Sequence, residues 1–216
     1  MRRIGGRCLL AAGPVFLLAN IVVGFGWKDP AYSWASNNIS DLGNVSCGTW
    51  DTTRPRYVCS PWHTAMNVSF LAVAALLAVG VVLTWRVLGR GGAVRTAQVL
   101  TLGGAAGFGL AGLYPADVNE NWHFLGALLI FVGANVALVV AGFARRETPL
   151  GGLRRVSLAL GALALAGTLL FLARVDVGVG IGGMERVPVF VPLLWVGIVG
   201  WRVTRFRPGA GFGTRG

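Results

Sequence analysis

Histidine and carboxylate side chains next to apolar segments are the residues of this sequence best suited to chemistry. Only two histidines are present, His63 and His123, and each stands at the start of a long apolar segment. Histidine is the only side chain whose ordinary pKa lies near neutrality, and it is the commonest metal ligand. A histidine paired with a carboxylate can act as general acid and base on a lipid headgroup. The predicted catalytic residues are Asp41, His63, Asp117, His123 and Glu185.

Nearby polar residues are predicted to line the same pocket and to bind the substrate. Asn67 follows His63 by four residues, which places both side chains on one face of a helix. The predicted substrate-binding residues are Asn38, Ser40, Asn67 and Arg186. Two histidines with two or three carboxylates are also a candidate zinc site with an open position for water. Because that geometry is hard to assemble from two histidines, we predict no cofactor and keep zinc as the less favoured alternative.

The elements that must position these residues are apolar blocks of membrane-spanning length. The chain is 55% hydrophobic and 12% charged, whereas a soluble domain is about 25% charged. Blocks of roughly twenty apolar residues cross a bilayer as helices, because the backbone must satisfy its own polar groups there. The predicted spans are residues 8–26, 61–84, 97–114, 122–143, 156–173 and 187–203, with no charged residue well inside any of them. We therefore predict an all-α, six-helix membrane bundle forming one domain over residues 1–216.

The few polar residues within these spans are predicted mainly to hold the helices together. Asn20, Ser69, Gln98 and Asn135 are the principal examples. Amide and hydroxyl side chains commonly hydrogen-bond between helices in a membrane, where water is absent. This structural interpretation is favoured over catalysis for each of the four.

Basic residues predict the orientation of the bundle in the membrane. The predicted topology gathers fourteen of the nineteen basic residues on one side, together with both chain termini. These fourteen are Arg2, Arg3, Arg7, Arg86, Arg90, Arg95, Arg145, Arg146, Arg154, Arg155, Arg202, Arg205, Arg207 and Arg215. The richer side is cytoplasmic by the positive-inside rule, which predicts a multi-pass protein of the plasma membrane, the inner membrane of a bacterium. The net charge of +11 is thus a topology signal, and we predict no nucleic-acid partner.

The first extracytoplasmic loop, at about residues 27–60, is by far the longest predicted connection. Long irregular loops are usually functional or disordered, and the aromatic residues of this one argue against disorder. We predict that it folds over the outer mouth of the bundle. Cys47 and Cys59 both lie in this loop, where the compartment is oxidising, so a disulfide is favoured over two free thiols. Cys8 stands apart at the inner end of the first span.

Several of these segments, taken in order, resemble a family of small bacterial and archaeal membrane proteins known as the domain of unknown function 998. The segments are residues 38–43 (Asn-Ile-Ser-Asp-Leu-Gly), 58–63, 66–70, 112–117, 123–127 and 183–186. The resemblance implies a six-helix bundle with the Ile-Ser-Asp-Leu-Gly signature on the outer side, and it implies no established activity. More distantly, the signature loop is similar to the eukaryotic membrane family that includes DRAM and GPI-anchor remodelling proteins, which hints at lipid chemistry.

The predicted function is to act on, or to bind, a lipid or lipophilic molecule at a pocket in the outer leaflet, with histidine and carboxylate acid–base chemistry as one mechanism. One alternative is a non-catalytic assembly or receptor protein of the membrane. Another is a metal-independent, terpene-cyclase-like enzyme or isomerase. A transporter is disfavoured, because charged groups are missing from the predicted spans. We expect a monomer or a small homo-oligomer.

Overall fold

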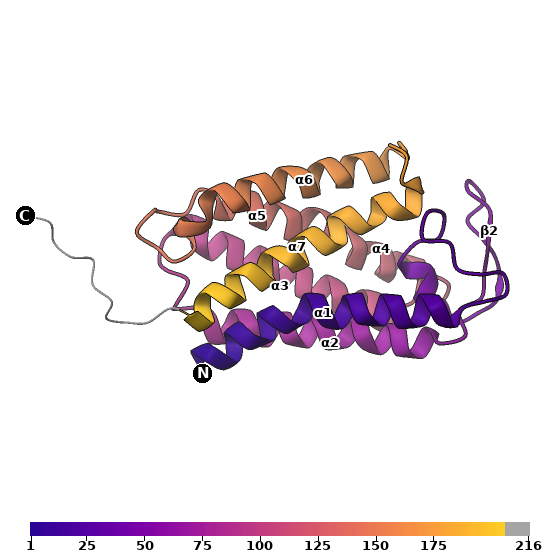
Figure 1. The fold of residues 1–216 in the computed structure, drawn as a ribbon, viewed down its shortest axis with the longest axis horizontal. Coiled ribbons are helices and arrows are strands. Elements are labelled where there is room, and N and C mark those ends of the chain that lie inside the picture. Colours follow the sequence, from indigo (N-terminus) through magenta and orange to yellow (C-terminus); the bar gives the residue numbers. More distant parts are fainter. Residues whose placement is uncertain (206–216) are drawn as a thin grey trace, which may run out of the picture.

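The computed structural model describes residues 1–205, in which six apolar helical spans lie side by side along one axis (Figure 1). The helices are α1 (Arg2–Gly26), α2 (His63–Thr84), α3 (Gly92–Leu113), α4 (Glu120–Leu128), α5 (Asn135–Ala141), α6 (Arg154–Leu172) and α7 (Gly180–Arg205). A π-helical segment, η2 (Leu129–Ala134), joins α4 to α5 within the fourth span, and a short turn, η3 (Gly151–Leu153), precedes α6. The predicted all-α class is confirmed. Arg207 and Arg215 lie outside the described residues.

The two ends of the bundle differ in what they carry (Figure 1). One end, called here the loop end, carries residues 27–62 and the connections from α3 to α4 and from α6 to α7. The other end, called here the arginine end, carries the N-terminus, the end of α7 and most of the arginines. Helix α1 packs between α2 and α7, so the first and last helices of the chain are neighbours.

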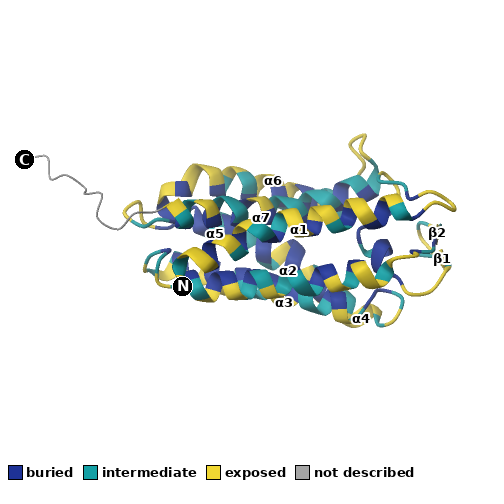
Figure 2. Cartoon of the chain, turned by 60° about the horizontal axis from the view of Figure 1, so that its bottom comes forward, coloured by how far each residue is buried: buried dark blue, intermediate teal, exposed yellow. Residues whose placement is uncertain are grey.

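The middle of the bundle exposes large apolar side chains to its surroundings (Figure 2). Leu18, Val68 and Leu169 are 62%, 57% and 69% exposed, respectively. Six helices are long and apolar enough to cross a membrane. The chain is therefore an integral, multi-pass membrane protein, and lipid covers the surface that would be unfavourable in water.

A group of aromatic rings from four helices forms the centre of the core. Phe16 of α1 lies 4.9 Å from Phe70 of α2, 5.2 Å from Phe108 of α3 and 5.7 Å from Phe190 of α7, measured between ring centroids. Tilted and edge-to-face arrangements are the favourable ones for such rings. Phe16 is fully buried, so this contact joins α1 to the rest of the bundle.

The last helix begins earlier than its apolar stretch predicts. We predicted a span starting at residue 187, with Glu185 and Arg186 in the preceding loop, but α7 starts at Gly180. The Asp176 carboxylate accepts the N–H groups of residues 178, 179 and 180, which satisfies donors at the start of the helix and lowers the pKa of Asp176. Gly180 has φ of 76°, and a Cβ there would collide with the Ala35 backbone. Glu185 and Arg186 therefore lie in the second turn of α7, where an apolar-run criterion misses them.

Two helix irregularities lie inside the bundle, and neutral side chains donate to a backbone carbonyl at each of them. Pro192 has no N–H, so the carbonyl of Pro188 lacks its helical partner, and the Asn135 Nδ2 donates to it over 3.2 Å. The Phe131 carbonyl, in η2, accepts from Asn135 Nδ2 at 2.8 Å and from Thr168 Oγ1 at 3.0 Å. We call this group of Asn135, Thr168 and the two carbonyls the polar junction. It links the fourth span, α6 and α7.

The other polar residues of the spans behave differently from Asn135. Asn20 donates only to Phe16 within its own helix, and Ser69 donates to Met66 within its own helix. Gln98 of α3 reaches the Trp85 carbonyl at the end of α2 over 2.8 Å. The predicted role in joining helices is therefore wrong for Asn20 and Ser69, whose bonds remain local.

Candidate functional site

The signature segment is a buried 3₁₀ turn, η1 (Ser40–Gly43), organised around one carboxylate. Asp41 is 1% exposed and accepts from the Asn38 N–H at 2.9 Å and from Asn37 Nδ2 at 3.1 Å. The Arg56 guanidinium donates to both of its oxygens, at 2.6 Å each. A two-pronged arginine–carboxylate pair is strong and geometrically specific. Asp41 therefore orders the loop, and its oxygens are occupied by protein donors.

Glu185 and Arg186 hold the same loop from the side of α7. The Glu185 Oε2 accepts the Ile39 N–H at 2.6 Å. Arg186 Nη1 donates to the carbonyls of Trp34 and Asn37 at 3.1 and 3.2 Å. Together with Asp41, these contacts dock residues 34–41 onto the first turns of α7. We call residues 27–62 the loop cap.

Tyr32 connects the loop cap to Arg186. Its hydroxyl donates to the Asn38 carbonyl at 2.8 Å and accepts from Arg186 Nη2 at 2.5 Å. Burial raises the pKa of the Tyr32 phenol, so the phenol stays neutral and keeps the proton that it donates. The Arg186 guanidinium also lies over the rings of Tyr32 and Trp34, 5.7 and 5.2 Å from their centroids.

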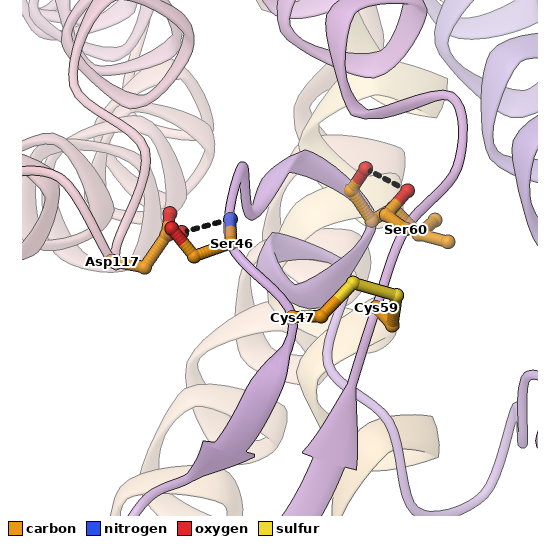
Figure 3. The surroundings of a disulfide bond; sticks show 6 residues. Ser46, Cys47, Cys59, Ser60 and Asp117 are labelled. Atoms are coloured by element: carbon orange, nitrogen blue, oxygen red, sulfur yellow. Dashed lines mark hydrogen bonds between the residues drawn. A yellow bond between two sulfur atoms is a disulfide. The ribbon is translucent and has the colours of Figure 1, made fainter.

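A disulfide and a short hairpin complete the loop cap (Figure 3). Strands β1 (Gly48–Trp50) and β2 (Arg56–Val58) pair in antiparallel fashion, and Cys47 is bonded to Cys59 directly beyond their paired ends. The predicted disulfide is confirmed, and Cys8 is free. The Asp117 Oδ2 accepts the Ser46 N–H at 2.7 Å, which joins this region to the start of the fourth span (Figure 3).

The predicted residues of α2 serve the loop or stand apart from it. Asn67 Nδ2 donates to the Gly43 carbonyl at 2.9 Å, beneath the signature turn. His63, the first residue of α2, is half-exposed. Among the described residues, its ring forms a hydrogen bond only with the adjacent Thr64 hydroxyl, at 3.5 Å from Nδ1. Within residues 1–205, no group of three or more His, Cys, Asp or Glu side chains is placed to hold a metal ion.

Two of the five predicted catalytic residues share a cavity. His123 and Glu185 line a space of about 20 Å³ together with Ser40. His123 Nδ1 lies 2.9 Å from the Tyr114 carbonyl, and a carbonyl can only accept, so Nδ1 carries the hydrogen. Nε2 is then the basic atom of the ring. Since a water needs at least roughly 10–15 Å³, this cavity has room for about one water molecule.

A much larger hollow in the described part of the chain lies elsewhere and was not predicted. It is a groove of about 950 Å³ between α1 and α7. Its walls are Leu10, Gly13, Pro14, Leu17, Arg186, Val187, Phe190, Val191, Leu193, Leu194, Gly197, Ile198 and Trp201. Arg186 is the only charged residue among them. A Cβ on Gly197 would meet no atom within 4 Å, so this glycine leaves the groove open.

Comparison with known protein families shows one match that covers most of the chain. The model of a family described as "Protein of unknown function (DUF998)" matches residues 10–202, from the first helix to the last. The chain belongs to the DUF998 family. No curated protein and no solved structure matches it. The more distant resemblance to the DRAM group stays a prediction.

The two candidate sites of this DUF998 protein lie on different sides of α7. Glu185 and Val189 of α7 line the small cavity, whereas Arg186 and Phe190 line the groove. Neighbouring residues of a helix point about 100° apart, so adjacent side chains can serve different sites. Sequence reasoning selected Arg186 for its charge beside Glu185, but it had no signal for the apolar walls. Apolar residues that line a groove and those that face lipid have the same composition.

Proposed function

We propose that the protein binds a membrane lipid in the groove between α1 and α7. The observation that carries this proposal is the groove itself, which measures about 950 Å³ and is apolar except for Arg186. Binding pockets for small molecules measure roughly 300–1,000 Å³, are mainly apolar and hold a few polar groups that orient the ligand. This groove is at the upper end of that range and has that composition.

The accessibility of the groove supports entry from the side. Leu17, Leu194 and Trp201 belong to its walls and are 48%, 56% and 50% exposed. They lie on apolar helices long enough to span the membrane, so the groove opens toward hydrocarbon. Acyl chains are the molecules available there, and each methylene group contacting apolar walls contributes up to about 0.8 kcal/mol where it replaces water contact, and less where it replaces lipid contact.

Acid–base chemistry at His123 and Glu185 is the second candidate function. The observation in its favour is that both side chains line one cavity. That cavity measures about 20 Å³, which accommodates roughly one water molecule and no headgroup. The groove therefore supports binding better than the cavity supports catalysis.

We further propose that the protein lies in the plasma membrane with its arginine end in the cytoplasm. The uneven distribution of arginine supports this orientation through the positive-inside rule. Arg186 then lies in the outer half of the membrane, at the end of the groove nearest the loop cap. The bound lipid accordingly comes from the outer leaflet.

Filling the groove tests the proposed function. The Gly197→Leu variant places a side chain in open space within the groove. The control, Gly103→Leu, places the same side chain in open space on α3, outside the groove. Both substitutions raise helix propensity by roughly 1 kcal/mol, so neither is expected to hinder folding. Delipidated protein is titrated with phosphatidylglycerol and with phosphatidylcholine of identical acyl chains, and bound lipid is counted by native mass spectrometry.

We expect Gly197→Leu to weaken binding of both lipids by roughly tenfold, because it displaces about two methylene groups from the groove. Gly103→Leu should bind as the wild type does. Equal binding by Gly197→Leu and the wild type would overturn the proposed function. Loss of binding in both variants would show that the loss does not depend on the groove, and it would overturn the proposal as well.

A further inference from the structure

Arg186 lines the groove, and no carboxylate of the described residues lies within 4.0 Å of its guanidinium. Among the described residues, the ion pairs within 4.0 Å are those of Arg56 with Asp41 and Asp51. The oxygens that Arg186 contacts are all neutral, being three backbone carbonyls and the Tyr32 hydroxyl. These bonds fix the position of the guanidinium, and none of them is an ion pair.

The carboxylate of the neighbouring residue, Glu185, points away from the groove and toward the small cavity. Glu185 is not one of the residues that line the groove. Its Oε2 accepts the Ile39 N–H, and the residue lines the small cavity with His123. Arg186 Nε is buried and has no hydrogen-bond partner within the described part of the chain. A buried donor without an acceptor is unfavourable.

The aromatic residues above Arg186 determine which headgroup charge fits. Tyr32 and Trp34 present their rings to the guanidinium at 5.7 and 5.2 Å. Rings of this kind would otherwise bind a quaternary ammonium group, but here a fixed cation already occupies their faces. A choline group at this place would meet like charge, whereas a phosphate without a cationic substituent would meet opposite charge.

The length of the groove indicates where the rest of the lipid lies. Arg186 and Trp201 both line the groove, and they are fifteen residues apart in α7. This separation corresponds to about 22 Å along a helix. The hydrocarbon core of a bilayer is about 30 Å thick. A lipid whose headgroup contacts Arg186 thus has apolar wall beside its whole chain.

We propose that the groove selects a lipid with an anionic phosphate headgroup, and that Arg186 is the residue that recognises it. This inference rests on the proposed function, since it concerns the occupant of the same groove. Arg186 both docks the loop cap and contacts the headgroup, so the loop cap presets the guanidinium for binding. The selected class is an anionic glycerophospholipid such as phosphatidylglycerol, in preference to a zwitterionic one.

Competition between two lipids of identical acyl chains tests the inference. Wild-type protein and three variants, Arg186→Gln, Arg186→Lys and Arg205→Gln, are mixed with equimolar phosphatidylglycerol and phosphatidylcholine. The ratio of the two bound lipids is read by native mass spectrometry. A ratio from one sample is insensitive to the amount of folded protein. Arg205 is a matched control, because it stands over Trp201 near the opposite end of the groove and its substitution removes the same charge.

We expect the wild type to prefer phosphatidylglycerol by about tenfold, the size of a hydrogen bond to a charged group. Arg186→Gln should bring the ratio close to one, while Arg186→Lys and Arg205→Gln should keep most of the preference. A wild-type ratio near one, or an unchanged ratio in Arg186→Gln, would overturn the inference. So would a preference lost only in Arg205→Gln. None of these results decides whether the groove binds lipid, because that proposal is tested separately by Gly197→Leu.

Discussion

The loop cap and the polar junction solve the same problem, that of unpaired backbone groups, with different side chains. In the loop cap, acidic residues do this work: Asp41 and Glu185 accept backbone N–H groups of residues 38 and 39. In the polar junction, the neutral Asn135 and Thr168 donate to the Pro188 carbonyl, freed by Pro192, and to the Phe131 carbonyl in the π-helical segment. Charged groups are tolerable near the membrane surface, where water is close, but expensive inside the bundle.

This difference changes the meaning of the predicted catalytic residues. Asp41 and Asp117 both hold loop backbone. Both oxygens of Asp41 are occupied by protein donors, whereas Asp117 uses Oδ2 and its buried Oδ1 has no partner among the described residues. The loop cap and the polar junction are therefore both structural, although the carboxylates that hold the loop cap are of the residue type expected in a catalytic site. The groove is the region that neither set of bonds fills, and this is the physical reason for assigning binding to it.

The largest expected effect concerns the sides of the membrane on which the two ends lie. Single cysteines at Thr52 and Val177, at the loop end, should react with a membrane-impermeant maleimide added to intact cells. Cysteines at Arg90 and Glu147, at the arginine end, should react only after permeabilisation. The background carries Cys8→Ser and retains the Cys47–Cys59 disulfide. Labelling of Arg90 and Thr52 positions from the same side would contradict the six-span topology.

The next largest effect is expected from the carboxylate at the centre of the loop cap. Asp41→Asn keeps the shape of the side chain but removes the nearer counter-charge of the buried Arg56 and leaves only Asp51, at 3.5 Å. Removing one partner of a buried ion pair costs roughly 3–5 kcal/mol. Thermal unfolding in detergent, followed by tryptophan fluorescence, should show a large drop in Tm. A Tm like that of the wild type would mean that Asp41 is free for chemistry after all.

Asp51→Asn is the matched control, because Asp51 faces the same guanidinium from the exposed tip of the hairpin, at 3.5 Å. We expect a loss of less than about 1 kcal/mol at pH 7, as for other surface pairs. The Thr53 hydroxyl is the main cause that lowers the pKa of Asp51 to about 2. A lowered folded-state pKa stabilises the protein above the unfolded value of about 3.9. That contribution is lost as the pH falls from there toward 2.

A smaller effect is expected inside the bundle, where two buried asparagines form a natural comparison. Asn135 and Asn20 each donate to the carbonyl four residues earlier, and each has a buried Oδ1 without a partner. Only Asn135 also reaches two other helices, at Thr168 and Pro188. We expect Asn135→Leu to cost about 1–2 kcal/mol and Asn20→Leu about 0.5 kcal/mol or less. Equal losses in Tm would remove the distinction between a bond that joins helices and one that stays local.

Sequence reasoning succeeded where the physical cause is local to a segment. Six apolar blocks of spanning length require six helices, because hydrocarbon offers the backbone no partners. Two cysteines 12 residues apart in one loop are close enough in sequence to pair without a contact between distant segments. Membership of the DUF998 family followed from short segments in order along the chain, and it is confirmed over residues 10–202.

Sequence reasoning failed where the outcome depends on which segments meet. The beginning of α7 was misplaced, because Asp176 and the neighbouring glycines extend that helix through polar residues. The partners of Glu185 and Arg186 lie about 150 residues earlier in the chain, and no spacing rule reaches that far. His63 and His123 share one depth in the sequence pattern, yet only His123 lines the cavity with Glu185.

The groove belongs wholly to the tertiary structure. Its walls come from α1 and α7, the first and last helices of the chain, which become neighbours only when the bundle closes. In a soluble protein, the contrast between apolar and polar residues marks the surface that will be buried. In a membrane, lipid-facing and groove-lining residues are equally apolar, so composition determines that the helices cross the bilayer, and packing alone decides where they leave space.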